Sequence, residues 1–215
     1  MIPIVPAIIP KSAEQIIKLL PELKFSPEIH IDVVDGKFVP FTSWPYEPKG
    51  EPSEVHTTTD SFTLEVDLMV SNPLEAADAW IKAGADMLVF HTETIDLQAF
   101  KRFVGSVKIS VGISALNDTP LSVLESYAVF ADYIQLMGIA EIGTQGQAFD
   151  ERVLERITTL KKLFPRLSIT IDGSVNEKTI AKLRAAGADR FICGSSIVDA
   201  LQPYVAYTEL QKLIN

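Results

Sequence analysis

The chain has 215 residues, of which 47% are hydrophobic and 22% are charged. This length is enough for one well-filled core and short for two ordinary domains. The formal net charge is −9 and lysine and arginine form no cluster, which argues against nucleic acid or an anionic membrane as a partner. The single cysteine, Cys193, excludes an internal disulfide framework and is expected to be a buried thiol. Residues 1–10 lack the basic start of a signal peptide and no apolar run reaches the length of a membrane span, so we expect a soluble cytoplasmic protein.

Short β-branched runs alternate with helical patterns along the chain. Strands are expected at 2–9, 28–34, 63–70, 87–93, 107–114, 133–139, 167–173 and 190–194, and helices at 12–23, 72–84, 96–105, 120–130, 150–164, 176–187 and 198–214. The expected helix caps are Ser12, Asn72, Asp96, Thr119 followed by Pro120, and Asn176. Strict alternation predicts a parallel sheet with right-handed crossovers. Eight such units predict a single closed (β/α)8 TIM barrel over residues 1–215, with an open doubly wound sheet as the weaker alternative.

The segment between Phe38 and Asp60 breaks this alternation. Residues 40–60 contain four prolines and a glycine, so a Pro-rich loop with about one helical turn is expected in place of the second helix. The loop is a lid, an interface or a solvated connector. Within it, Trp44 and Tyr46 are candidates for covering the barrel mouth or for a subunit contact.

Along three of the expected strands, successive side chains point alternately to the outside and to the inside of the barrel. Apolar side chains at 29, 31, 33, 64, 66, 68, 169 and 171 suit the layer of helices outside the barrel. The opposite parity turns His30, Asp32, Glu65, Asp67, Met69, Thr170 and Asp172 toward the interior. Such folds place their chemistry at the C-terminal ends of the strands, where these polar groups would meet.

One imidazole and three carboxylates converge in this arrangement, namely His30, Asp32, Asp67 and Asp172. As bare charges the carboxylates would repel one another, and a divalent cation would relieve that repulsion. A mixed set of nitrogen and oxygen ligands favours Fe, Mn, Co or Zn over Ca. The sequence therefore predicts a site for one divalent metal ion.

Small residues follow the last three expected strands. These segments are 142–147 (IGTQGQ, with Gly143 and Gly146), 172–176 (DGSVN) and 193–196 (CGSS). Glycine and serine at such places let backbone N–H groups approach an anion, and the loops after strands seven and eight are the usual phosphate site of this barrel. A small phosphorylated ligand is expected.

The motifs resemble those of the ribulose-phosphate 3-epimerase family over nearly the whole chain. The resemblance is carried by HIDVVDGKFVP (30–40), LEVDLMVSNP (64–73), GISALNDTPLSVLE (112–125), YIQLMGI (133–139) and residues 169–198. It implies interconversion of D-ribulose 5-phosphate and D-xylulose 5-phosphate by proton transfer at C3, assisted by a divalent metal. It also implies that this protein is a homo-oligomer.

The resemblance also implies roles for individual residues. Asp32 and Asp172 match the catalytic acid and base of the family. Together with His30, they also match three of its metal ligands. The remaining matches are Met69 and Met137, which would line the site, and Gly173, Ser174, Gly194 and Ser195, which would bind phosphate.

Departures from the family pattern fall in the same region. Asp67 stands where the family has its fourth metal ligand, a histidine; Ala7 replaces a serine, Val34 replaces a methionine, and the loop at 137–147 is altered. One interpretation is that Asp67 still binds metal and shifts the preference toward harder ions such as Mn or Fe. The other is a phosphosugar-binding or regulatory relative that no longer holds the metal.

Overall fold

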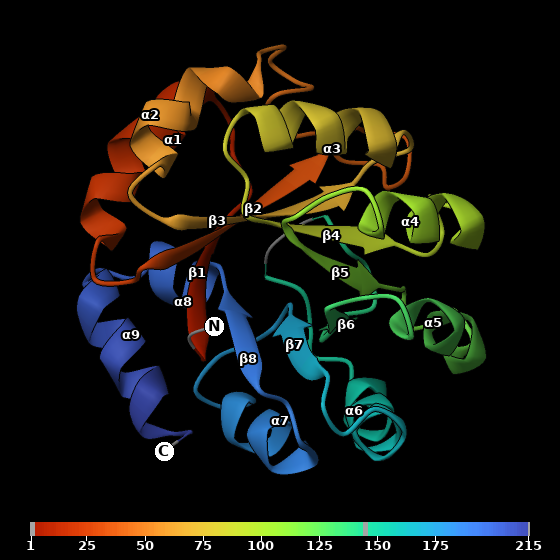
Figure 1. The fold of residues 1–215 in the computed structure, drawn as a ribbon. Coiled ribbons are helices and arrows are strands. Elements are labelled where there is room, and N and C mark those ends of the chain that lie inside the picture. The colour runs from red at the N-terminus through yellow and green to blue at the C-terminus, as the bar shows by residue number, and fades with distance from the viewer. Residues whose placement is uncertain (1–2, 144–145, 215) are drawn as a thin grey trace.

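In a computed structural model that describes residues 3–143 and 146–214, eight parallel strands close into a barrel in sequence order, as predicted (Figure 1). The strands are β1 (Ile4–Ile8), β2 (Glu28–Val34), β3 (Thr63–Met69), β4 (Met87–His91), β5 (Ser110–Ser114), β6 (Tyr133–Met137), β7 (Ser168–Asp172) and β8 (Arg190–Cys193). The barrel closes where the first strand, β1, pairs with the last strand, β8. Residue 2 of the first expected strand lies outside the described residues.

Helices surround the barrel as an outer layer (Figure 1). They are α1 (Ala13–Leu19), α2 (His56–Thr59), α3 (Pro73–Lys82), α4 (Leu97–Val104), α5 (Leu121–Ala128), α6 (Arg152–Leu163), α7 (Ile180–Ala186), α8 (Ser195–Val198) and α9 (Pro203–Lys212), with 3-10 turns η1 (Leu20–Leu23) and η2 (Pro52–Val55). Among the described residues, no helix is long and apolar enough to cross a bilayer.

The burial pattern agrees with the parity expected for β2, β3 and β7. Side chains at 29, 31, 33, 64, 66, 68, 169 and 171 lie in one large apolar cluster with the inner faces of the helices. Burying each of these side chains is worth about 1.5–3 kcal/mol. This fixes the register, because a slip of one residue would turn the whole set into the barrel and the polar residues toward the helices. The same constraint turns the polar residues of these strands into the barrel.

Two helix starts differ from the sequence-based expectation. Ser12 and Asp96 cap α1 and α4 through their side chains, as expected. The Asn176 side chain accepts the Lys178 amide as a cap would, but the helix expected from it begins only at Ile180. The last expected helix, 198–214, begins only at Pro203, the first residue of α9, and the short α8 ends where it was expected to start.

The segment after β2 forms a loop whose helical parts are the short η2 and α2, in agreement with its prolines. Trp44 is 2% exposed and packs edge-on against Trp80 of α3, with ring centroids 6.0 Å apart. Its expected roles at the mouth or in a subunit contact are therefore wrong for the indole, which anchors the loop to α3. Tyr46 remains 39% exposed.

Candidate active site

Four polar side chains from β2, β3 and β7 come together inside the barrel. One ligand atom from each of His30, Asp32, Asp67 and Asp172 lies within 4.8 Å of the others. Asp32 and Asp67 are opposite each other in the register of β2 and β3, which explains their closeness. His30 and Asp67 are fully buried, Asp32 is 5% exposed and Asp172 is partly exposed. The expected cluster is thus assembled by strand register.

The His30 ring lies between two carboxylates. Its Nε2 is 3.1 Å from Asp32 Oδ1 and its Nδ1 is 2.6 Å from Glu65 Oε2. Burial lowers the pKa of His30, but the charges of Glu65 and Asp32 outweigh burial and raise this pKa well above its usual value. The imidazole is therefore held firmly, with one nitrogen toward the cluster and the other toward Glu65.

Asp67 has two donors on neighbouring strands. His91 Nε2 lies 2.8 Å from Asp67 Oδ1, and the Gln135 side-chain amide donates to Oδ2 at 2.8 Å. Burial lowers the pKa of His91, whereas the Asp67 carboxylate raises it, and the net direction is upward. These contacts explain how a carboxylate is accommodated in a fully buried position.

Asp32 and Asp172 have raised pKa values. For Asp32 the main cause is burial, opposed by His30 and reinforced by Asp67 and Glu65. For Asp172 burial comes first and the neighbouring Asp32 charge adds to it, so its pKa lies well above the usual range. A carboxyl pair of this kind retains a proton more readily than exposed carboxyls do, which suits proton transfer.

A cavity of about 330 Å³ opens beside Asp32 and Asp172. All eight residues expected to contact substrate or phosphate line it: Met69, Met137, Gly143, Gly146, Gly173, Ser174, Gly194 and Ser195. Ala7, Asn176 and Ser196 also line the cavity. Thr144 and Gln145 of the expected 142–147 loop lie outside the described residues.

The turn after Asp172 is fixed by a close approach of two backbones. Gly138 N–H donates to the Asp172 carbonyl at 2.6 Å. A Cβ at Gly138 would lie 2.1 Å from the Gly173 carbonyl oxygen, so only glycine fits there. Gly173 itself has φ +92, a left-handed conformation. The end of β6 thereby positions Asp172 at the cavity.

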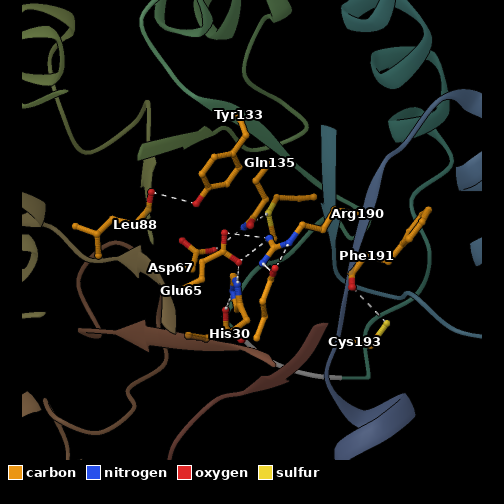
Figure 2. Close-up of polar contacts among 12 residues, drawn as sticks. His30, Glu65, Asp67, Leu88, Tyr133, Gln135, Arg190, Phe191 and Cys193 are labelled. Carbon is orange, nitrogen blue, oxygen red and sulfur yellow. Dashed lines mark hydrogen bonds and ion pairs between the residues drawn. The ribbon is translucent and has the colours of Figure 1, made fainter. Parts of the chain in front are cut away.

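A buried cation in the barrel was not anticipated from the sequence. Arg190 of β8 reaches inward and pairs with Glu65 at 2.8 Å (Figure 2). It also pairs with Glu28 at 3.0 Å. Phe191 and Cys193 of the same strand belong to the outer apolar cluster. The parity of β8 would therefore have turned Arg190 inward, where it could have been matched to Glu65.

Comparison with known proteins decides the family. The family model described as "Ribulose-phosphate 3 epimerase family" matches residues 4–198. The chain belongs to the ribulose-phosphate 3-epimerase family. It is 32% identical over 191 residues to a ribulose-phosphate 3-epimerase of Aquifex aeolicus, covering 86% of this chain and 84% of that protein. The corresponding enzyme of Chlamydia pneumoniae is 30% identical over 179 residues, covering 80% and 76% of the two chains.

Solved structures support the barrel fold of this family member. The structure of 3-hexulose-6-phosphate synthase from Salmonella typhimurium superposes with a TM-score of 0.74 at 13% identity, covering 99% of this chain and 98% of that chain. At that identity the likeness concerns the fold alone.

The donor set fits a divalent metal ion. One imidazole and three carboxylates lie within 4.8 Å of one another in a largely buried position. Such a set could hold Fe, Mn, Co or Zn. Asp67 is the one member whose two oxygens both already accept a hydrogen bond, from His91 and Gln135.

Proposed function

We propose that this protein is a ribulose-phosphate 3-epimerase-like enzyme that interconverts D-ribulose 5-phosphate and D-xylulose 5-phosphate, or a related ketose phosphate. The observation that carries the proposal is the meeting of Asp32 and Asp172 beside one cavity, with His30 and Asp67 in the same cluster. Inverting a carbon without a second substrate requires one group to remove a proton and another to return it to the opposite face. Membership of an epimerase family supports this reaction class.

Asp32 and Asp172 are the proposed acid and base. Both carboxyls line the cavity, and both have pKa values raised by burial. A raised carboxyl pKa brings proton affinity closer to neutral pH, where a residue can both accept and return a proton. Each would face the C3 atom of the bound sugar and hold its proton in turn.

His30, Asp32, Asp67 and Asp172 are the proposed ligands of one divalent metal ion. When bound, this ion would stabilise the negative charge that develops on the substrate oxygens after C3 loses its proton. Because the set contains three carboxylates, it favours Mn or Fe more than a set with a second imidazole would.

The proposed phosphate site consists of the backbone turns that line the cavity. It includes Gly143, Gly146, Gly173, Ser174, Gly194 and Ser195, and Met69 and Met137 line the space toward the metal site. The absence of large side chains at these positions lets backbone N–H groups approach the phosphate oxygens.

A proton-exchange assay tests the proposal. The protein would be incubated with D-ribulose 5-phosphate in heavy water with Mn, Fe, Co or Zn, and deuterium at C3 would be followed. We expect exchange with at least one metal, and its loss in Asp32→Asn and Asp172→Asn. Unchanged exchange in both variants, or none in the unmodified protein with any metal, would refute the enzymatic proposal.

The hydrogen bonds of Asp67 favour a second candidate function, a phosphosugar-binding or regulatory protein without turnover. Both oxygens of Asp67 already have donors, which lowers the gain from metal coordination. Calorimetric binding of D-ribulose 5-phosphate without metal, together with no deuterium exchange, would support this candidate. Asp67→His tests the position directly, since increased exchange with Zn would identify it as a metal-ligand position.

Self-association is a separate proposal. We expect a homo-oligomer, because the family resemblance implies one, and sedimentation velocity at several protein concentrations measures the state.

A further inference from the structure

Beneath the four-residue cluster, three buried side chains form a linear hydrogen-bonded series. His30 Nδ1 lies 2.6 Å from Glu65 Oε2, and Arg190 Nη1 donates to the two oxygens of Glu65 at 2.8 and 3.1 Å (Figure 2). The three side chains come from β2, β3 and β8, and each is at most 1% exposed. The series ends at His30, whose other ring nitrogen faces Asp32.

The position of the imidazole proton decides whether His30 can bind a metal. A neutral imidazole carries one proton, and only the nitrogen without it has a lone pair for a ligand bond. An ionised carboxylate can only accept hydrogen bonds. Glu65 therefore holds one proton on Nδ1, and a metal ion would bind by displacing the proton of Nε2, the nitrogen that lies toward the cluster.

Arg190 restrains Glu65, because both carboxylate oxygens accept from its guanidinium. The two contacts from one guanidinium nitrogen to the Glu65 oxygens restrict rotation of the carboxylate. Arg190 is restrained in turn by Glu28, which accepts from Nε and Nη2 at 3.3 and 3.0 Å.

We propose that Glu65, held by Arg190, is a positioning residue that presents His30 to the metal ion through Nε2. The proposal rests on the metal site of the proposed function and assigns roles to two residues outside it. It differs from a purely structural role of the ion pair, in which Glu65 would matter only for folding.

Glu28 provides a matched control for this distinction. Both Glu28 and Glu65 are buried and both accept hydrogen bonds from Arg190, but only Glu65 also contacts His30. Removing the charge from either carboxylate disturbs the same ion-pair network. Only removal at position 65 changes the acceptor of the imidazole proton.

A carboxamide at position 65 would weaken the contact with His30, whereas one at position 28 would keep the contacts with Arg190. In Glu65→Gln, an amide oxygen in the place of Oε2 could accept from both His30 and Arg190, but the NH2 group in the place of Oε1 would face the Arg190 Nη1–H donor. This repulsion displaces the carboxamide, and its neutral oxygen is a weaker acceptor of the His30 Nδ1 proton than a carboxylate is. In Glu28→Gln, the amide oxygen can accept both contacts that Arg190 makes there, because both go to one oxygen, Oε2.

The experiment measures Zn²⁺ affinity by competition with a fluorescent chelator, in the unmodified protein, Glu65→Gln and Glu28→Gln. Zn²⁺ is chosen because it is diamagnetic and binds nitrogen and oxygen sites more tightly than Mn²⁺ or Fe²⁺. Loss of the group that orients a histidine ligand typically weakens binding about 10–100-fold. We expect that loss in Glu65→Gln and a change within about 2-fold in Glu28→Gln, by the same reasoning.

A second measurement needs no variant and covers the case in which Glu65→Gln does not fold. In ¹⁵N-labelled unmodified protein loaded with Zn²⁺, His30 should show a protonated Nδ1 and a metal-shifted Nε2. Coordination through Nδ1, or His30 signals that do not move on adding Zn²⁺, would overturn the proposal. So would equal Zn²⁺ affinities in the two glutamine variants, while the proposed epimerase activity would remain intact in that case. If the unmodified protein bound no Zn²⁺, Mn²⁺ or Fe²⁺, both the metal-dependent function and this inference would be refuted.

Discussion

Replacing Arg190 by methionine tests how much the buried charges of the barrel depend on one another. Arg190→Met keeps roughly the length of the side chain but removes the guanidinium, which is 1% exposed and pairs with Glu65 and Glu28 at 2.8 and 3.0 Å. Both carboxylates would then remain in the interior without this cation. Removing one partner of a buried ion pair costs about 3–5 kcal/mol.

The magnitude can be measured by urea unfolding at pH 7.5 and by thermal melting. For a chain of this size, each kcal/mol corresponds to about 2–4 °C in Tm, so we expect Arg190→Met to melt about 6–20 °C lower. The control is Lys212→Met, because Lys212 pairs with Glu209 at the surface and the two side chains are 68% and 49% exposed. That control is expected to leave the urea midpoint nearly unchanged.

Acid should reduce the difference between Arg190→Met and the unmodified protein. The pKa of Glu65 is lowered in the folded protein, so its stabilisation is present above the unfolded pKa of about 4.3 and is lost as pH falls through the folded value. Without Arg190 the pKa of Glu65 in the folded protein rises. The destabilisation caused by its buried, ionised carboxylate then declines as pH falls through that raised pKa and the group becomes neutral. A loss below about 1 kcal/mol at pH 7.5, or a loss that does not shrink by pH 5, would refute this reasoning.

Three further predictions concern backbone contact, loop packing and the thiol. Gly138→Ala should lower C3 proton exchange about 100-fold, because its Cβ would displace the Gly173 carbonyl, 2.1 Å away. The control Gly105→Ala, whose Cβ has its nearest contact at 3.5 Å, should have little effect. Equal exchange rates in the two variants would contradict this prediction. Trp44→Ala should destabilise the protein by about 3–5 kcal/mol in urea unfolding, and a loss under about 1 kcal/mol would show that the indole does not anchor the loop. Burial raises the pKa of the Cys193 thiol, so a disulfide reagent should react only after unfolding; rapid labelling of the native protein would contradict the buried position.

The polar residues inside the barrel could be predicted because, in three strands, every second side chain is apolar. Once residues such as Ile31 and Val66 are assigned to the helix layer, Asp32 and Asp67 have no orientation except inward. Glycine and serine after the later strands likewise indicated the residues around the cavity. The local sequence pattern was therefore enough to predict both the fold and the positions of the candidate site residues.

The partners of these residues could not be predicted from local patterns. Arg190 and Glu65 are 125 positions apart, and Gln135 and Asp67 are 68 positions apart. Their contacts depend on the closure of the barrel and on which side chains are long enough to meet across its interior. Trp44 shows the same difficulty, because a proline-rich loop contains no signal for the helix on which its indole packs.

The ion pairs of Arg190 have a consequence for the order in which the chain can become stable. Glu28 and Glu65 are made early, whereas Arg190 follows them by 162 and 125 positions and lies on the last strand. A nascent chain that stops before β8 contains both acids without the cation that accommodates them in the interior. Burying them at that stage would be unfavourable, which discourages premature closure of an incomplete ring during synthesis. The charged interior thus favours completion of the barrel only after its final strand is available.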